Sequence, residues 1–189
     1  MSSFEIAVRS LLGTVFLVSS LSKARDRAAY RGFVRSLAHM RVVPPALDEP
    51  AARAVLAAEF ATWMLLVVPA GPAGRLGLLL ATLLLAAFTF GIARTLRRRS
   101  PVACNCFGPS ATPVGRRHVV RNVLLAAAAL GCLLAPAAGG PAGAGHVLVA
   151  AVAGLVTGLV TTALDEIVAL FRPLPDTRAS RAPVRPSAS

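Results

Sequence analysis

Charged and aromatic residues are both scarce in this chain of 189 residues. Only 15% of the residues are charged and 56% are hydrophobic, and the mean hydropathy is +0.68, which excludes a soluble domain of ordinary composition. The net charge of +12 could by itself suggest a nucleic-acid-binding protein, but a single Tyr and a single Trp leave almost nothing to stack on bases. Because the basic residues cluster between long apolar runs, the composition predicts an integral membrane protein that binds no nucleic acid.

Cysteine is scarce as well. Three thiols are too few, and odd in number, for a scaffold held together by disulfides, so at most one pair and one remaining thiol can exist. The sequence also contains no glycine-rich phosphate-binding loop and no His-Glu metalloprotease motif. Cysteine usage alone leaves the redox compartment open.

Five apolar segments approach the length of about 20 residues that a helix needs to cross a bilayer. We therefore expect an all-α, multi-pass transmembrane bundle over residues 1–172, with a four-helix core, a fifth C-terminal helix, and a disordered basic tail over 173–189. The first segment could instead be a signal peptide ending near Ala24, but its basic residues follow the apolar run, the reverse of the usual order. The predicted helices cover residues 4–21, 54–70, 76–93, 119–138 and 147–170.

Lys and Arg alternate between the connections. Seven lie between Lys23 and Arg53 and seven between Arg94 and Arg121, whereas Arg75 is the one cation in the other two connections, and four more follow the fifth segment. Since cytoplasmic loops accumulate Lys and Arg, this pattern predicts a protein of the cytoplasmic (inner) membrane with its N-terminus outside and its C-terminus inside.

Residues 26–40 show a helical, amphipathic pattern. Apolar side chains at Tyr30, Phe33 and Leu37 are opposed by arginines at positions 27, 31 and 35. We expect this segment to lie along the membrane surface with its arginines among the lipid headgroups.

Cys104 and Cys106, in the segment Cys-Asn-Cys-Phe-Gly, are the candidate catalytic residues. Flanking arginines favour the thiolate and so lower the pKa of both cysteines. A disulfide between residues two apart would be strained and easily reduced, which suits a redox relay. Two incidental thiols, or a soft-metal site such as a copper site with His118 as a further ligand, remain alternatives. Cys132 lies inside the fourth segment and is predicted to be a small buried apolar residue.

Glu59 is an ionisable residue inside the second segment and therefore needs a partner. Lys23 is the first partner we expect and Arg9 the second, and the pair could be a structural lock or a proton-handling or ligand-binding site. We expect Arg9 to pair with Glu5 on one helix face and to reach water at the membrane interface.

Small residues at positions 154 and 158 of the fifth segment predict a face for close helix packing. Asp165 and Glu166, near the end of that segment, are expected to be interfacial.

Several of these features together resemble the methylamine utilisation MauE family of membrane proteins, relatives of the DoxX-like group, over roughly residues 4–138. The motifs that carry the resemblance are residues 16–23, Pro44-Pro45, Glu59, the Cys104–Gly108 segment and Arg121-Asn122. The family resemblance implies a helical bundle that supports maturation of a disulfide-rich amine dehydrogenase subunit together with a thioredoxin-like partner.

The predicted bundle also looks like that of vitamin K epoxide reductase, and only this second resemblance implies a cofactor, a quinone. The chain departs from that pattern because it has Cys-x-Cys in place of Cys-x-x-Cys and no cysteine after its first segment. A separate protein would then have to supply the second dithiol. The reductase resemblance puts Cys104 and Cys106 on the outer face, whereas the arginine pattern puts them inside, and we favour the arginine pattern because it rests on this sequence.

Overall fold

The computed structural model describes residues 2–68, 71–97, 116–135 and 143–170, with side chains as far as residue 163. Within these ranges the chain is helical and has no strand. The elements are α1 (Ser3–Ala24), α2 (Arg27–Met40), a 3₁₀ turn η1 (Pro45–Leu47), α3 (Asp48–Val67), α4 (Pro72–Arg97), α5 (Arg116–Leu134) and α6 (Ala144–Leu170).

Five of these helices, α1, α3, α4, α5 and α6, are long and apolar enough to cross a membrane. The all-α, multi-pass bundle predicted from the sequence is therefore confirmed. The predicted segment 54–70 differs most from its helix, because α3 begins at Asp48. Its polar first turns belong to the helix but carry no apolar signal. The predicted tail over residues 173–189 lies outside the described residues.

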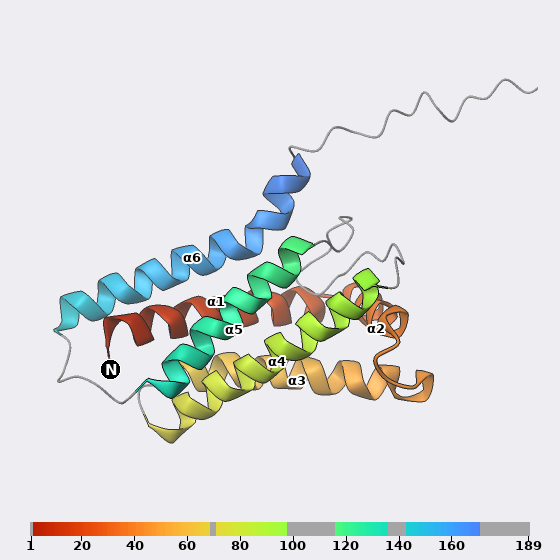
Figure 1. The fold of residues 1–189 in the computed structure, drawn as a ribbon, viewed down its shortest axis with the longest axis horizontal. Coiled ribbons are helices and arrows are strands. Elements are labelled where there is room, and N and C mark those ends of the chain that lie inside the picture. The colour runs from red at the N-terminus through yellow and green to blue at the C-terminus, as the bar shows by residue number, and fades with distance from the viewer. Residues whose placement is uncertain (1, 69–70, 98–115, 136–142, 171–189) are drawn as a thin grey trace, which may run out of the picture.

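The five long helices run alternately in opposite directions, and α2 lies across one end of the bundle (Figure 1). We call this the α2 end. It is the end at which α1 and α4 finish, at Ala24 and Arg97, and at which α3 and α5 begin, at Asp48 and Arg116. Arg9 and Arg75 belong to the opposite end, and the other described Lys and Arg residues gather at the α2 end.

Helix α1 is the centre of the structure and contacts α2, α3, α5 and α6. Its residues Leu12 and Phe16 are fully buried and pack with Leu66 of α3, Leu85 of α4 and Ala129 of α5 in one apolar core. Large apolar side chains also cover the outer surfaces of the long helices, which a bilayer would accommodate. Examples of these exposed residues are Met64, Leu83, Leu124, Leu148 and Val149.

Helix α6 lies against α1 through the two glycines predicted to form a close packing face. A Cβ at Gly154 would clash with the carbonyl oxygen of Ala7, and a Cβ at Gly158 would lie 2.8 Å from the Cβ of Thr14. The Ser10 hydroxyl also donates to the Ala151 carbonyl at 2.7 Å. Small residues at these positions therefore allow the two backbones to approach, as the spacing predicted.

Helix α2 has the amphipathic character predicted for residues 26–40. Its N-cap is Asp26, whose carboxylate accepts a hydrogen bond from the backbone N–H of Ala29 at 2.7 Å. Phe33 is 1% exposed and faces the bundle, whereas Arg31 and Arg35 are exposed on the other side. Burial of one face thus holds α2 against the ends of the long helices.

Arg9 departs from its expected position. It pairs with Glu5 at 3.7 Å, as predicted, but it is 5% exposed and does not reach water. Its guanidinium donates to the Leu66 carbonyl from Nε at 3.2 Å and from Nη2 at 3.0 Å, and Nη2 also donates to the Val68 carbonyl. Because the last carbonyls of a helix have no partner within it, Arg9 satisfies the C-terminal end of α3. This contact joins α1 to α3 across the chain.

Candidate functional site

The two cysteines predicted to be catalytic, Cys104 and Cys106, lie outside the described residues. The structure describes the residues that bracket this segment, Arg97 at the end of α4 and Arg116 at the start of α5. Helices α4 and α5 pack against each other, and both residues belong to the α2 end of the bundle (Figure 1).

Lys23 and Glu59 are brought together inside the bundle. The ammonium Nζ of Lys23 on α1 lies 2.5 Å from Oε1 of Glu59 on α3, and the side chains are 1% and 0% exposed. Ser19 lies one turn before Lys23 on the same face of α1. Its hydroxyl accepts a hydrogen bond from Lys23 Nζ at 2.8 Å and donates one to Glu59 Oε1 at 3.2 Å. Arg9, the second expected partner of Glu59, instead binds the other end of α3.

Two aromatic rings complete the surroundings of the Lys23 ammonium. Nζ lies 4.8 Å from the centre of the Phe33 ring on α2 and 5.4 Å from the centre of the Phe88 ring on α4. The negative face of an aromatic ring attracts a cation, and this attraction grows when water is excluded. Four helices, α1 to α4, therefore contribute to one buried site at the α2 end.

Some buried polar atoms have no hydrogen-bond partner among the described residues. They include Oε2 of Glu59, Nε1 of Trp63 one turn further along α3, and both side-chain amide atoms of Asn122 on α5. Asn122 is 0% exposed. Because buried polar groups are nearly always satisfied, such atoms indicate places where water or a polar ligand can bind.

The sequence identified Glu59 and Lys23 as a pair but did not identify Asn122 or Trp63 as candidate site residues. Asn122 appeared only as part of the Arg121-Asn122 motif, although an amide inside an apolar helix is itself a signal for a polar contact between helices. The orphaned indole of Trp63 has no equivalent signal, because tryptophan is common both in cores and at membrane interfaces.

One oxygen of the Glu59 carboxylate, Oε1, is held by the Lys23 ammonium and the Ser19 hydroxyl. The other oxygen, Oε2, can accept a hydrogen bond from a further donor. Such a pair fixes α1 against α3, and it can also hold a proton or a small polar molecule at Oε2. Within the described residues, Cys132 is a free, partly buried thiol packed against the apolar core, as predicted. The side chains of Asp165 and Glu166 lie outside the described residues.

Comparison with curated proteins and with solved structures gives no match. A family model described as methylamine utilisation protein MauE matches residues 1–135. This range contains α1 to α5, the Lys23–Glu59 pair and both cysteines of the Cys-x-Cys segment, and it leaves α6 outside. The family predicted from the sequence motifs is thereby confirmed. The chain belongs to the methylamine utilisation protein MauE family and is a multi-pass membrane protein.

Proposed function

We propose that this protein supports methylamine utilisation by thiol–disulfide exchange between its Cys104–Cys106 pair and a thioredoxin-like protein. The observation that carries the proposal is the family match over residues 1–135, which includes both cysteines. The packing of α4 against α5 supports it, because the helix ends that bracket the cysteine segment lie at one end of the bundle, within reach of a protein at the membrane surface.

The exchange proceeds in two steps, the formation and then the resolution of a mixed disulfide. The thiolate of one cysteine attacks a disulfide of the partner, forming a mixed disulfide and releasing one partner thiolate, which takes up a proton. The second cysteine, as a thiolate, then attacks the mixed disulfide. The Cys104–Cys106 disulfide forms and the partner leaves as a dithiol, so two electrons pass from this protein to the partner, and the reverse sequence passes them back.

In this proposal the protein lies in the cytoplasmic (inner) membrane, with its N-terminus outside and its C-terminus in the cytoplasm. The gathering of the described cations at the α2 end supports this orientation, since cytoplasmic ends are rich in Lys and Arg. The cysteine segment is then cytoplasmic, and the thioredoxin-like partner is a cytoplasmic donor or acceptor of electrons. The maturation of a disulfide-rich partner outside the cell would follow only indirectly.

The buried pair of Lys23 and Glu59 has a positioning role in this proposal. It joins α1 to α3 beneath α2, and Phe88, which lies near Lys23, ties the pair to α4. Since α4 carries the cysteine segment at its C-terminal end, the pair helps to keep that end of the bundle in place.

A second candidate function is a non-redox scaffold or small-molecule carrier in which Glu59 is the working residue. The observation that favours it is that, among the described residues, Oε2 of Glu59 and the amide of Asn122 are buried and have no hydrogen-bond partner. Both groups offer hydrogen bonds to a polar ligand inside the bundle. In this case the cysteines are incidental, and Glu59→Gln abolishes function while Cys104→Ser does not.

Trapping of the partner tests the leading proposal. In cells that depend on methylamine, Cys106→Ser leaves Cys104 unable to resolve a mixed disulfide, so we expect a covalent adduct that disappears on reduction. Cys132→Ser is the matched control and forms no adduct. If replacing both Cys104 and Cys106 with serine changed neither growth nor the thiol state of thioredoxin-like proteins, the redox proposal would be wrong. Stoichiometric copper bound through both sulfurs would support a metal-handling role in its place.

A further inference from the structure

The outer face of α2 carries an ordered row of arginines. Arg27, Arg31 and Arg35 follow one another at intervals of four residues and are all exposed. Nε of Arg31 donates to the Arg27 carbonyl at 3.2 Å, and Nε of Arg35 donates to the Arg31 carbonyl at 3.4 Å. These bonds hold the guanidinium groups of Arg31 and Arg35 along the helix and leave their terminal amino groups as donors for a ligand.

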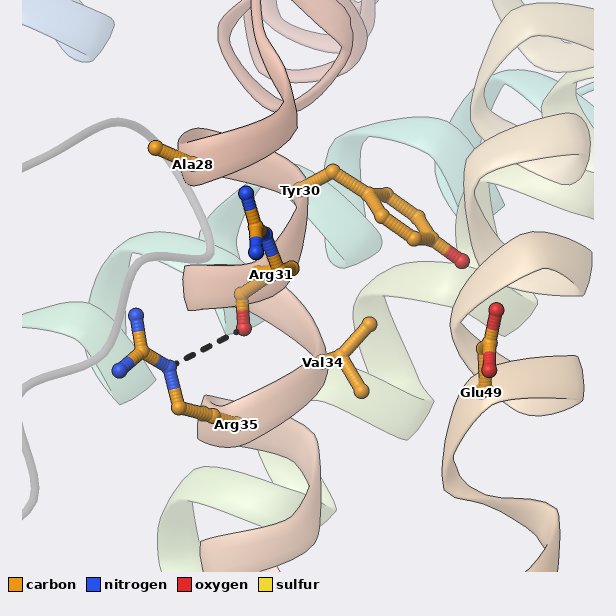
Figure 2. A pocket seen from close by; sticks show the side chains of 6 residues that line it. All are labelled: Ala28, Tyr30, Arg31, Val34, Arg35 and Glu49. Atoms are coloured by element: carbon orange, nitrogen blue, oxygen red, sulfur yellow. Dashed lines mark hydrogen bonds between the residues drawn. The ribbon is translucent and has the colours of Figure 1, made fainter.

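A pocket of about 540 Å³ opens beside this row (Figure 2). Arg31 and Arg35 form one side, Glu49 of α3 lies on the other, and Tyr30 and Val34 lie between them. The pocket thus combines a cationic rim with an apolar and aromatic floor.

The charges of the pocket favour an anion at its arginine side. Glu49 is the one carboxylate among the lining residues, and it forms an ion pair with Arg53 one turn further along α3. Its negative charge is therefore offset, and Arg31 and Arg35 lie on the side of the pocket away from it. Guanidinium groups bind phosphate through two parallel hydrogen bonds, so two of them four residues apart suit a phosphate group.

The position of the pocket indicates the source of that phosphate. Helix α2 begins at Arg27, three residues after α1 ends, and so lies where five apolar helices leave the bilayer. Lipid headgroups occupy this level, and an aromatic residue such as Tyr30 is at home there. Val34 and Tyr30 offer apolar surface to the glycerol and upper acyl chain of a lipid, which a free phosphate or an acidic peptide would leave uncovered.

We propose that this pocket binds the headgroup of an anionic phospholipid, with the phosphate on Arg31 and Arg35 and the glycerol region against Tyr30 and Val34. The site is separate from the buried Lys23–Glu59 pair and does not depend on the redox proposal. It gives α2 a specific lipid partner in addition to a general attraction to the membrane surface.

Lipid titration of the full-length protein in detergent, followed by native mass spectrometry, tests the proposal. The probes are short-chain phosphatidylglycerol and phosphatidylcholine. A cation near an anionic surface contributes about 1 kcal/mol, so each Arg→Gln change at position 31 or 35 should weaken phosphatidylglycerol binding about fivefold, and the double change about 25-fold. Arg75→Gln, an exposed arginine at the opposite end, is the matched control and should change nothing.

Each other outcome overturns part of the claim. Equal losses for Arg75→Gln and for the α2 variants would mean a diffuse charge effect without a pocket. Equal binding of phosphatidylcholine and phosphatidylglycerol would mean that the pocket does not require an anionic headgroup. Displacement of the lipid by inorganic phosphate or by an acidic peptide at similar concentrations would mean that the pocket is not a lipid site. Arg31→Lys keeps the charge but loses the paired hydrogen bonds, so it should bind more phosphatidylglycerol than Arg31→Gln and less than the wild type, and it distinguishes loss of charge from loss of folding.

Discussion

Replacement of Lys23 by Met should strongly destabilise the bundle. Met keeps most of the length of the side chain but removes the ammonium, so among the described residues the buried Glu59 carboxylate keeps only the Ser19 hydroxyl on Oε1. Breaking a buried ion pair by removing one partner costs about 3–5 kcal/mol, because an uncompensated charge remains. For a protein of this length, that corresponds to a fall in melting temperature of about 6–20 °C.

The double replacement provides the sharper comparison. Lys23→Met with Glu59→Gln removes both charges, and a buried pair replaced by neutral groups of similar volume is often close to neutral in stability. We therefore expect the double variant to be more stable than Lys23→Met, with a coupling free energy of about 2–3 kcal/mol between the two positions. Glu59→Gln alone should cost less than Lys23→Met, because the Phe33 and Phe88 rings still surround the ammonium.

The assay is thermal unfolding of the full-length protein in lipid nanodiscs, with helix content and intrinsic fluorescence as independent probes. Glu49→Gln with Arg53→Met is the control, since this exposed pair one turn apart on α3 should contribute little. If Lys23→Met shifted the melting temperature no more than the control, or if the double variant lost as much as the two single variants added together, the buried pair would not hold the bundle as we infer.

Three further predictions concern the packing and ends of the helices. Gly154→Leu should separate α6 from α1, because there is no room for a Cβ, whereas Gly145→Leu on the same helix enters open space; disulfide crosslinking between cysteines introduced on α1 and α6 of a cysteine-free protein should fail only for the first. Arg9→Met should cost about 2–3 kcal/mol, since it leaves buried carbonyls at the end of α3 without donors; a melting temperature equal to that of the wild type would contradict this. The backbone N–H of Ala29 and then Arg25 hold the pKa of the Asp26 carboxyl below its usual value, so its capping of α2 should be complete above the ordinary carboxyl range and be lost as pH falls through the lowered pKa; Asp26→Asn should remove that pH dependence of α2 helicity while keeping the cap.

The sequence predicted the bundle and its buried pair because both follow from strong local rules. Apolar runs of sufficient length must be helices in a bilayer, and an ionisable residue such as Glu59 must find an opposite charge. Lys23 was the natural partner because it follows the first apolar segment directly. The second segment, which carries Glu59, enters the membrane on the side where the first one leaves it. The small residues at 154 and 158 predicted close packing for an equally local reason, since no other side chains allow two backbones to touch.

Arg9 and Asn122 show where sequence reasoning fails. The groups that Arg9 binds are backbone carbonyls of α3, which carry no signal in the sequence and become available only because α3 ends beside α1. The expectation that a charge near the end of a membrane helix reaches water therefore placed Arg9 at the interface, which was wrong. The lack of a hydrogen-bond partner for Asn122 among the described residues is likewise a property of how α5 packs, because the same amide would be satisfied if a neighbouring helix presented a hydroxyl.

The central claim is that Cys104 and Cys106 join and separate at the membrane surface, and labelling with a membrane-impermeant maleimide tests it most directly. In a Cys132→Ser background, we expect labelling only in opened cells and, for the oxidised fraction, only after reduction. Two cysteines that stay fully reduced in opened cells under every growth condition would contradict thiol exchange. Labelling of the reduced pair in intact cells would place the cysteines outside and contradict the proposed orientation.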